Sequence, residues 1–176
     1  MLSPPLLVVP DDCPWTIVLG VDPGTQVVGY GALVLRDEGP RLLAAGVIRA
    51  GRGRSVPARL ATVRNELDAL LARLKPAVVV VEKAFAALNI ASALRVGEGR
   101  GVALSCAASF GAEVHEYTPA EAKKSVVGNG QADKTQVAAM VMQVLALAQA
   151  PEPLDATDAL ALALTYVHKS RLIGRL

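Results

Sequence analysis

Two strongly apolar segments of the sequence each end on an acidic residue. The segment "TIVLGVD" covers residues 16–22 and ends on Asp22, and "AVVVVE" covers residues 77–82 and ends on Glu82. Nearly continuous apolar runs of this length are typical of strands that are buried on both faces. If the two strands are parallel neighbours, ~4.8 Å apart, their carboxylates meet at the edge where open α/β sheets bind ligands. A buried carboxylate is costly unless its charge is compensated, so this placement predicts a functional site.

The remainder of the chain predicts further strands and helices around these two segments. Residues 27–36 and 41–50 are predicted to be antiparallel strands, because only the short turn "DEGP" separates them. Leucines at helical spacing predict a helix over 56–74, which ends before Pro76. The other predicted elements are a helix at 89–109, a strand at 113–117, a helix opened by the capping sequence "TPAE" at 118–121, and helices at 133–149 and 154–169. This order indicates an α/β fold with a mixed sheet flanked by helices.

The last predicted helix adds a second pair of acids to the candidate site. Asp155 and Asp158 lie at i and i+3, on one face and near the helix N-terminus, where a single acid could equally be a cap or a solvated residue. Four carboxylates brought together would repel one another unless a cation sat between them. Oxygen ligands favour hard ions, so Mg²⁺ or Mn²⁺ is the expected occupant. His115 and His168 lie far apart without ligand spacing, so they are expected to be packing or surface residues and zinc is not expected.

The length and the charge of the chain narrow the classes of protein to which it can belong. A chain of 176 residues is expected to form one domain with its own core. The formal charge of +2 does not by itself indicate a nucleic-acid partner, although an acidic site can mask a basic surface around it. Cys13 and Cys106 show neither a metal-binding spacing nor a disulfide framework, which fits a reducing cytoplasm.

The sequence predicts no association with a membrane. No apolar run approaches the ~18 residues that a membrane span needs, and the N-terminal segment lacks the basic start and cleavage site of a signal peptide. Residues 1–14 are rich in proline and are expected to be a loose extension.

Two motifs are similar to phosphate-binding loops but fail in their context. In "GNGQADKT", residues 128–135, Asp133 stands where the loop needs glycine, and a predicted helix precedes it where a strand belongs. Asp133 is better interpreted as a helix cap. The segment "DPGT" at 22–25 is similar to the phosphate loop of the actin and sugar-kinase superfamily, but those proteins need two such domains and this chain has room for one.

Five segments together resemble the successive motifs of one nuclease family. These are "VLGVDPGTQVVGYG", "VVVEKAF", "NIASALRVGEGRGVAL", "KKSVVGNGQADKTQV" and "LDATDALALAL". In this order and spacing they resemble RuvC, a family of bacterial Holliday junction resolvases, over residues 16–169. The resemblance implies a ribonuclease H-like fold with a five-stranded mixed sheet in residues 15–170, and a short C-terminal tail at 171–176.

The resemblance also implies an activity and a set of catalytic residues. The chain would be a Mg²⁺-dependent endonuclease that resolves four-way DNA junctions in recombination and repair by paired symmetric nicks, leaving 5′-phosphate and 3′-hydroxyl ends. Asp22, Glu82 and Asp155 would be the main metal ligands and Asp158 the fourth, holding two ions ~3.5–4 Å apart for which Mn²⁺ can substitute. Lys134 would be catalytic, stabilising charge on the phosphate in the transition state, unless it is a solvated lysine in the first turn of its helix.

Further residues are expected to contact DNA. Phe85 resembles the aromatic residue with which the family contacts unstacked bases, although on sequence alone it could equally pack against the core. Basic residues around the site are candidate phosphate contacts, any one of which could instead be merely solvated. They are Arg52, Arg54, Lys83, Arg95, Arg100, Lys123 and Lys124.

The partners that the resemblance implies are four-way junction DNA, a second copy of the chain, and the branch-migration proteins RuvA and RuvB. Gly97 and Gly101 lie one turn apart in a predicted helix, where they could form the dimer interface or pack against the chain's own sheet. Two alternatives remain open for the function. One is another ribonuclease H-like nuclease, acting on RNA–DNA hybrids or in transposition, and the other is a junction-binding module that does not cut.

Overall fold

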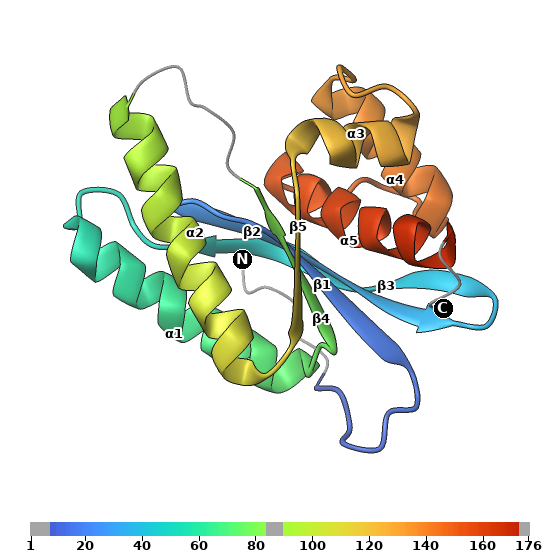
Figure 1. The fold of residues 1–176 in the computed structure, drawn as a ribbon, viewed down its shortest axis with the longest axis horizontal. Coiled ribbons are helices and arrows are strands. Elements are labelled where there is room, and N and C mark those ends of the chain that lie inside the picture. Colours follow the sequence, from blue (N-terminus) through green and yellow to red (C-terminus); the bar gives the residue numbers. More distant parts are fainter. Residues whose placement is uncertain (1–7, 84–89, 173–176) are drawn as a thin grey trace.

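The computed structural model describes residues 8–83 and 90–172, which form a mixed sheet with helices on both faces (Figure 1). The strands in this part of the chain are β1 (Thr16–Asp22), β2 (Val27–Arg36), β3 (Gly39–Arg49), β4 (Val78–Glu82) and β5 (Glu113–Tyr117). They form one five-stranded sheet in the order β3-β2-β1-β4-β5. The β1, β2 and β3 strands form an antiparallel meander, and β4 is parallel to both β1 and β5. The predicted five-stranded mixed sheet is therefore confirmed.

Alternation along the central strands divides the core into two layers. Ile17, Leu19 and Val21 of β1 belong to the cluster of buried residues that also includes the inner faces of α1 (Val56–Leu74) and α2 (Ile90–Phe110). Val18 belongs to the opposite cluster, which packs under α3 (Pro119–Val127), α4 (Lys134–Leu145) and α5 (Leu154–Leu172). A strand with buried residues on both faces explains the nearly continuous apolar run from residue 16 to 21.

The helix ends follow local capping chemistry. Thr118 and Glu121 form the predicted capping box at the start of α3, and Asp133 caps α4 by accepting from the Gln136 N–H. The phosphate-loop interpretation of residues 128–135 thus has no support, and the cap is confirmed. The α4 helix ends at Leu145 rather than near 149, because Ala146 takes a left-handed conformation with φ 53° that closes the last turn.

The N-terminal segment is packed where the structure describes it. Val9 is buried in the cluster under α1, and its N–H donates to the Arg73 carbonyl at 3.0 Å. The expectation of a loose extension is therefore wrong at Val9, whose branched apolar side chain gains by burial against the end of α1. Within residues 8–83 and 90–172, no helix is long and apolar enough to cross a membrane.

Candidate active site

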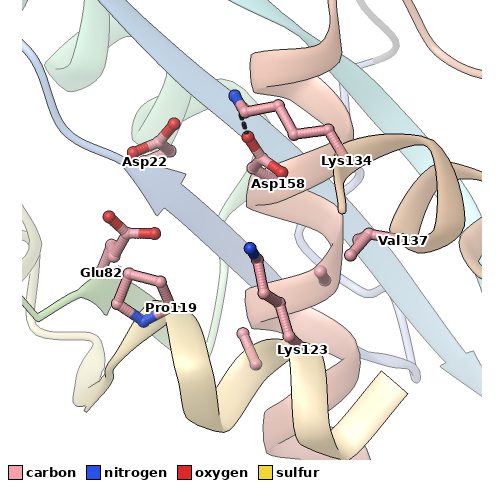
Figure 2. A pocket seen from close by; sticks show the side chains of 9 residues that line it. Asp22, Glu82, Pro119, Lys123, Lys134, Val137 and Asp158 are labelled. Atoms are coloured by element: carbon pink, nitrogen blue, oxygen red, sulfur yellow. Dashed lines mark hydrogen bonds and ion pairs between the residues drawn. The ribbon is translucent and has the colours of Figure 1, made fainter. Parts of the chain in front are cut away.

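Strand pairing and side-chain alternation bring the two strand-end acids together. The β1 and β4 strands pair in parallel up to Val21 and Val81, the residues immediately before Asp22 and Glu82. Both acids have the parity of the residues that face α5, since Val18 and Val80 belong to that cluster. The carboxylates consequently project from neighbouring strands on one side of the sheet (Figure 2).

Glycines in β1 and β2 let the α5 helix approach the sheet closely enough to add its acids. A Cβ placed on Gly20 would lie 1.9 Å from the Ala159 carbonyl oxygen, and one on Gly29 would lie 2.2 Å from the Asp155 carbonyl oxygen. Gly29 is the cross-strand partner of Asp22. Because Gly29 has no side chain, the first turn of α5 can occupy the space directly beside Asp22.

Three carboxylates converge as a result. One oxygen each of Asp22, Asp155 and Asp158 lies within 4.8 Å of the others. Glu82 lines a cavity of about 230 Å³ together with Asp22 and Asp158 but is outside this tightest group. The predicted convergence of four acids is therefore seen as three acids in ligand-like proximity, with Glu82 in the same cavity. Figure 2 shows Asp22, Glu82 and Asp158 around this cavity.

Burial and mutual repulsion make these carboxylates bind protons more tightly. Burial, followed by the charges of Asp158 and Asp155, raises the pKa of Asp22 to about 6. Burial, followed by the charge of Asp22, raises the pKa of Glu82 to about 7. Such raised values are expected where carboxylates crowd together without a neutralising cation.

Two lysines face the same cavity and offset part of this charge. Lys134 is the first residue of α4, and its Nζ donates to Asp158 at 2.7 Å and lies 3.7 Å from Asp155. The hydrogen bond to Asp158 raises the pKa of Lys134, so the ammonium stays charged. Its side chain is 55 % exposed, which leaves donors free for a further anion. Lys123 of α3 points into the cavity from another side (Figure 2).

The donor set fits a hard divalent ion. Every acidic group at the site offers carboxylate oxygens, the ligands that Mg²⁺ and Mn²⁺ prefer. Burial and the neighbouring carboxylates raise the pKa of Asp22 and of Glu82, and a bound cation would favour their charged forms. The two histidines are placed elsewhere. The His115 ring stacks with Tyr117 and is tilted against Tyr166, and its Nε2 lies 2.8 Å from a Glu113 carboxylate oxygen. The His168 Nδ1 lies 3.2 Å from the Ser125 hydroxyl oxygen.

The other predicted DNA-contact residues are spread over the molecule. Lys83, Arg95 and Lys124 are exposed, whereas Arg100 is half-buried and forms an ion pair with Glu116. Arg52 and Arg54 are exposed in the loop before α1, where Arg54 donates to the Thr62 hydroxyl at 2.8 Å. Phe85 lies outside the described residues.

Several residues that shape the site were not predicted from the sequence. Pro119 and Val137 line the cavity, and Gly20 and Gly29 set the position of α5. A usable signal existed for the glycines: Gly29 and Gly31 lie two apart in a predicted strand, which leaves one face without side chains.

One face of α2 is apolar, small and open. Ile90 and Leu94 are 80 % and 65 % exposed, and Gly97 and Gly101 continue the same face at helical spacing. A Cβ on either glycine would meet nothing within 4 Å. The possibility that these glycines pack against the chain's own sheet is therefore excluded. Gly99, on the opposite side of α2, instead faces inward, where a Cβ would lie 2.7 Å from the carbonyl oxygen of Gly24 in the loop between β1 and β2.

Comparisons with known proteins agree on one family. The sequence model of "Crossover junction endodeoxyribonuclease RuvC" matches residues 18–166. The crossover junction endodeoxyribonuclease RuvC of Heliobacterium modesticaldum is 43 % identical over 152 residues, covering 86 % of this chain and 94 % of the relative.

Solved structures give the same result. Thermus thermophilus RuvC superposes with a TM-score of 0.81 at 32 % identity, covering 89 % of this chain and 96 % of that one. The structure of Thermus thermophilus RuvC in complex with a Holliday junction substrate matches with a TM-score of 0.80 at 30 % identity and the same coverage. With the fold, the acidic site and these relatives in agreement, this chain belongs to the RuvC family of crossover junction endodeoxyribonucleases.

Proposed function

We propose that this chain resolves four-way DNA junctions by metal-dependent nicks at the acidic cavity. The observation that carries the proposal is the convergence of Asp22, Asp155 and Asp158 at the carboxyl edge of the sheet, in a chain of the RuvC family. A relative of 30 % identity is described in complex with a Holliday junction substrate, which supports the same substrate class here. The nuclease domain is assigned to residues 15–170.

The acids and lysines have distinct proposed roles. Asp22, Asp155 and Asp158, with Glu82 in the same cavity, would hold Mg²⁺, and the four carboxylates are enough to share two ions. Bound ions would supply an activated water and charge stabilisation at the scissile phosphate. Lys134 is held by Asp158 and its side chain is half-exposed, so it can donate to a phosphate oxygen from a fixed position.

Basic residues and an apolar helix face extend the site toward DNA and partner proteins. Lys123 shares the cavity with Lys134 and is the best placed of the other basic residues to contact the strand that is cut. The open apolar face of α2 supports a two-fold dimer that presents two identical sites to the two strands of a junction. Family membership supports cooperation with the branch-migration proteins RuvA and RuvB. A four-way DNA junction as the substrate supports a cytoplasmic location.

A substrate panel tests the proposal. Cleavage is measured on a mobile four-way junction, a linear duplex of the same sequence and an RNA–DNA hybrid, each with Mg²⁺ and with a chelator. We expect paired nicks on the junction in Mg²⁺, little cleavage of the duplex, and no cleavage with the chelator, because the clustered carboxylates need a cation to act.

The other outcomes favour other functions. Preferential cleavage of the hybrid would indicate a nuclease of the same fold with a different substrate. Tight junction binding without cleavage in Mg²⁺ or Mn²⁺ would indicate a module that binds junctions and does not cut them.

A further inference from the structure

A second cavity adjoins the acidic one. It has a volume of about 550 Å³ and is lined by Lys134 of α4, by residues 150–153 of the loop between α4 and α5, and by Leu154 and Asp155 at the start of α5. Lys134 lines both cavities, and Asp155 belongs to the tight carboxylate group. When a DNA strand has a phosphate at the acidic cavity, the neighbouring nucleotide of that strand can therefore reach the second cavity.

The wall of this cavity is fixed to the helix that carries the acids. The hydroxyl of buried Thr157 donates to the Pro151 carbonyl at 3.1 Å, and the Ala156 N–H donates to the Pro153 carbonyl at 2.9 Å. The two prolines restrict the backbone further. The loop thus keeps a set position relative to Asp155 and is suited to hold a group in register with the reaction.

The lining suits a planar ring better than a phosphate. Pro151, Pro153 and the 41 % exposed Leu154 offer apolar surface for stacking. The one acidic side chain of this lining besides Asp155 is exposed Glu152, which disfavours phosphate by repulsion. An ionised carboxylate only accepts hydrogen bonds, and in nucleic acid it pairs with exocyclic amino groups such as cytosine N4.

We propose that this cavity receives the base of a nucleotide beside the scissile phosphate, and that Glu152 selects among bases by accepting from an exocyclic amino group. The proposal rests on the proposed junction-cleaving function and adds a specificity-determining subsite to it. Lys134 marks the boundary between the site of the phosphate and the site of the base.

The test uses full-length protein and four-way junctions that differ only in the nucleotide on each side of the nick. Single-turnover cleavage rates are measured in Mg²⁺ for the wild type, Glu152→Gln and Glu38→Gln. Glu38 is exposed in the turn between β2 and β3, so its variant is a matched control for loss of one carboxylate.

On one side of the nick the wild type is expected to favour a base with a suitably placed amino group over thymine by roughly tenfold. Glu152→Gln is expected to reduce this difference to about twofold or to change the order, since an amide donates as well as accepts. Glu38→Gln is expected to keep the wild-type order.

A second probe changes the DNA and not the protein, so its main result is obtained with the wild type. The preferred base is replaced by an analogue without its exocyclic amino group, and the wild-type rate is expected to fall by roughly tenfold. The same replacement is expected to leave the rate of Glu152→Gln nearly unchanged.

Different results would contradict the proposed subsite and the proposed function. A wild type that cuts junctions without base preference, or a Glu152→Gln variant that keeps the wild-type order and range, overturns the subsite alone. A wild type that does not cut junctions contradicts the proposed function itself.

Discussion

At the scale of single residues, the site is built by placing carboxylates where their charge is unfavourable. Asp22 and Glu82 could be predicted as a pair because each ends an apolar run, and such runs form neighbouring central strands. Burial raises the pKa of both groups; the charges of Asp158 and Asp155 add to the shift of Asp22, and the charge of Asp22 adds to that of Glu82. The hydrogen bond from Lys134 to Asp158 could not be predicted, because it depends on how α4 docks against α5.

Removing the charge of Asp22 should stabilise the protein when no metal is bound. When the pKa of a carboxyl group is higher in the folded protein than in the unfolded chain, the free energy of unfolding falls as the pH rises between the two values. For Asp22 this loss runs from the ordinary value near 4 up through about 6. With chelator at pH 7.5, Asp22→Asn should therefore have a free energy of unfolding roughly 1–3 kcal/mol above that of the wild type.

Denaturant unfolding at pH 4 and pH 7.5, with chelator and with Mg²⁺, provides the measurement. The difference between variant and wild type should vanish near pH 4 and reverse in Mg²⁺, which stabilises the wild type by binding its folded state. Asp37→Asn, in the exposed turn after β2, should behave as the wild type. Equal stability of Asp22→Asn and the wild type at pH 7.5 without metal would contradict the crowding of charge inferred here.

At the scale of elements, the decisive contact is that of α5 with the first two strands. The sequence predicted each of these elements with nearly the observed bounds, since apolar alternation, leucine spacing and caps are local signals. It did not predict how closely α5 packs against the sheet, because this distance depends on Gly20 and Gly29 of the sheet facing the backbone of the helix. The early end of α4 at Leu145 also escaped prediction, because nothing in the sequence marks Ala146 as left-handed.

Adding a methyl group at Gly29 should move the acids of α5 out of place. In Gly29→Ala the new Cβ would lie 2.2 Å from the Asp155 carbonyl oxygen, so the first turn of α5 must shift. Displacements of ~1 Å cost on the order of 100-fold in rate, and overpacking costs ~1–3 kcal/mol in stability. Junction cleavage, Mg²⁺ affinity and thermal unfolding should all be impaired, and wild-type cleavage with unchanged Mg²⁺ affinity would show that the close approach is not required.

At the scale of the whole molecule, the sheet separates two surfaces with different tasks. One face carries α3, α4 and α5 with the acidic site, and the other carries α1 and α2 (Figure 1). The sequence left open whether Gly97 and Gly101 face inward or outward, and the fold answers this because Gly99 takes the inward position. Which basic residues contact DNA depends on the path of the junction over both subunits, which local patterns do not encode.

A charge on the open face of α2 should separate the proposed dimer. Leu94→Glu places a carboxylate in the middle of this face and should weaken self-association by roughly 100-fold or more, because an unpaired charge is costly to bury. Sedimentation at micromolar concentration should show monomer. On a plasmid with an extruded cruciform, nicked circles should replace linear product, because linear product requires both nicks.

Val8→Glu is the matched control, since Val8 is also apolar and exposed but lies outside α2. It should sediment as a dimer and yield linear plasmid. A Leu94→Glu variant that remains dimeric would show that the subunits meet elsewhere.

The central claim is that the clustered carboxylates cut the junction and are not needed to bind it. The most direct measurement is single-turnover cleavage and equilibrium binding of one four-way junction in Mg²⁺ by the wild type, Asp22→Asn and the control Asp37→Asn. Asp22→Asn should lose cleavage by on the order of 10²–10³-fold or more, while its binding is retained or tightened because a negative charge near the phosphates is gone. Asp37→Asn should match the wild type in both measurements. Cleavage by Asp22→Asn at the wild-type rate would contradict the assignment of this cavity as the active site.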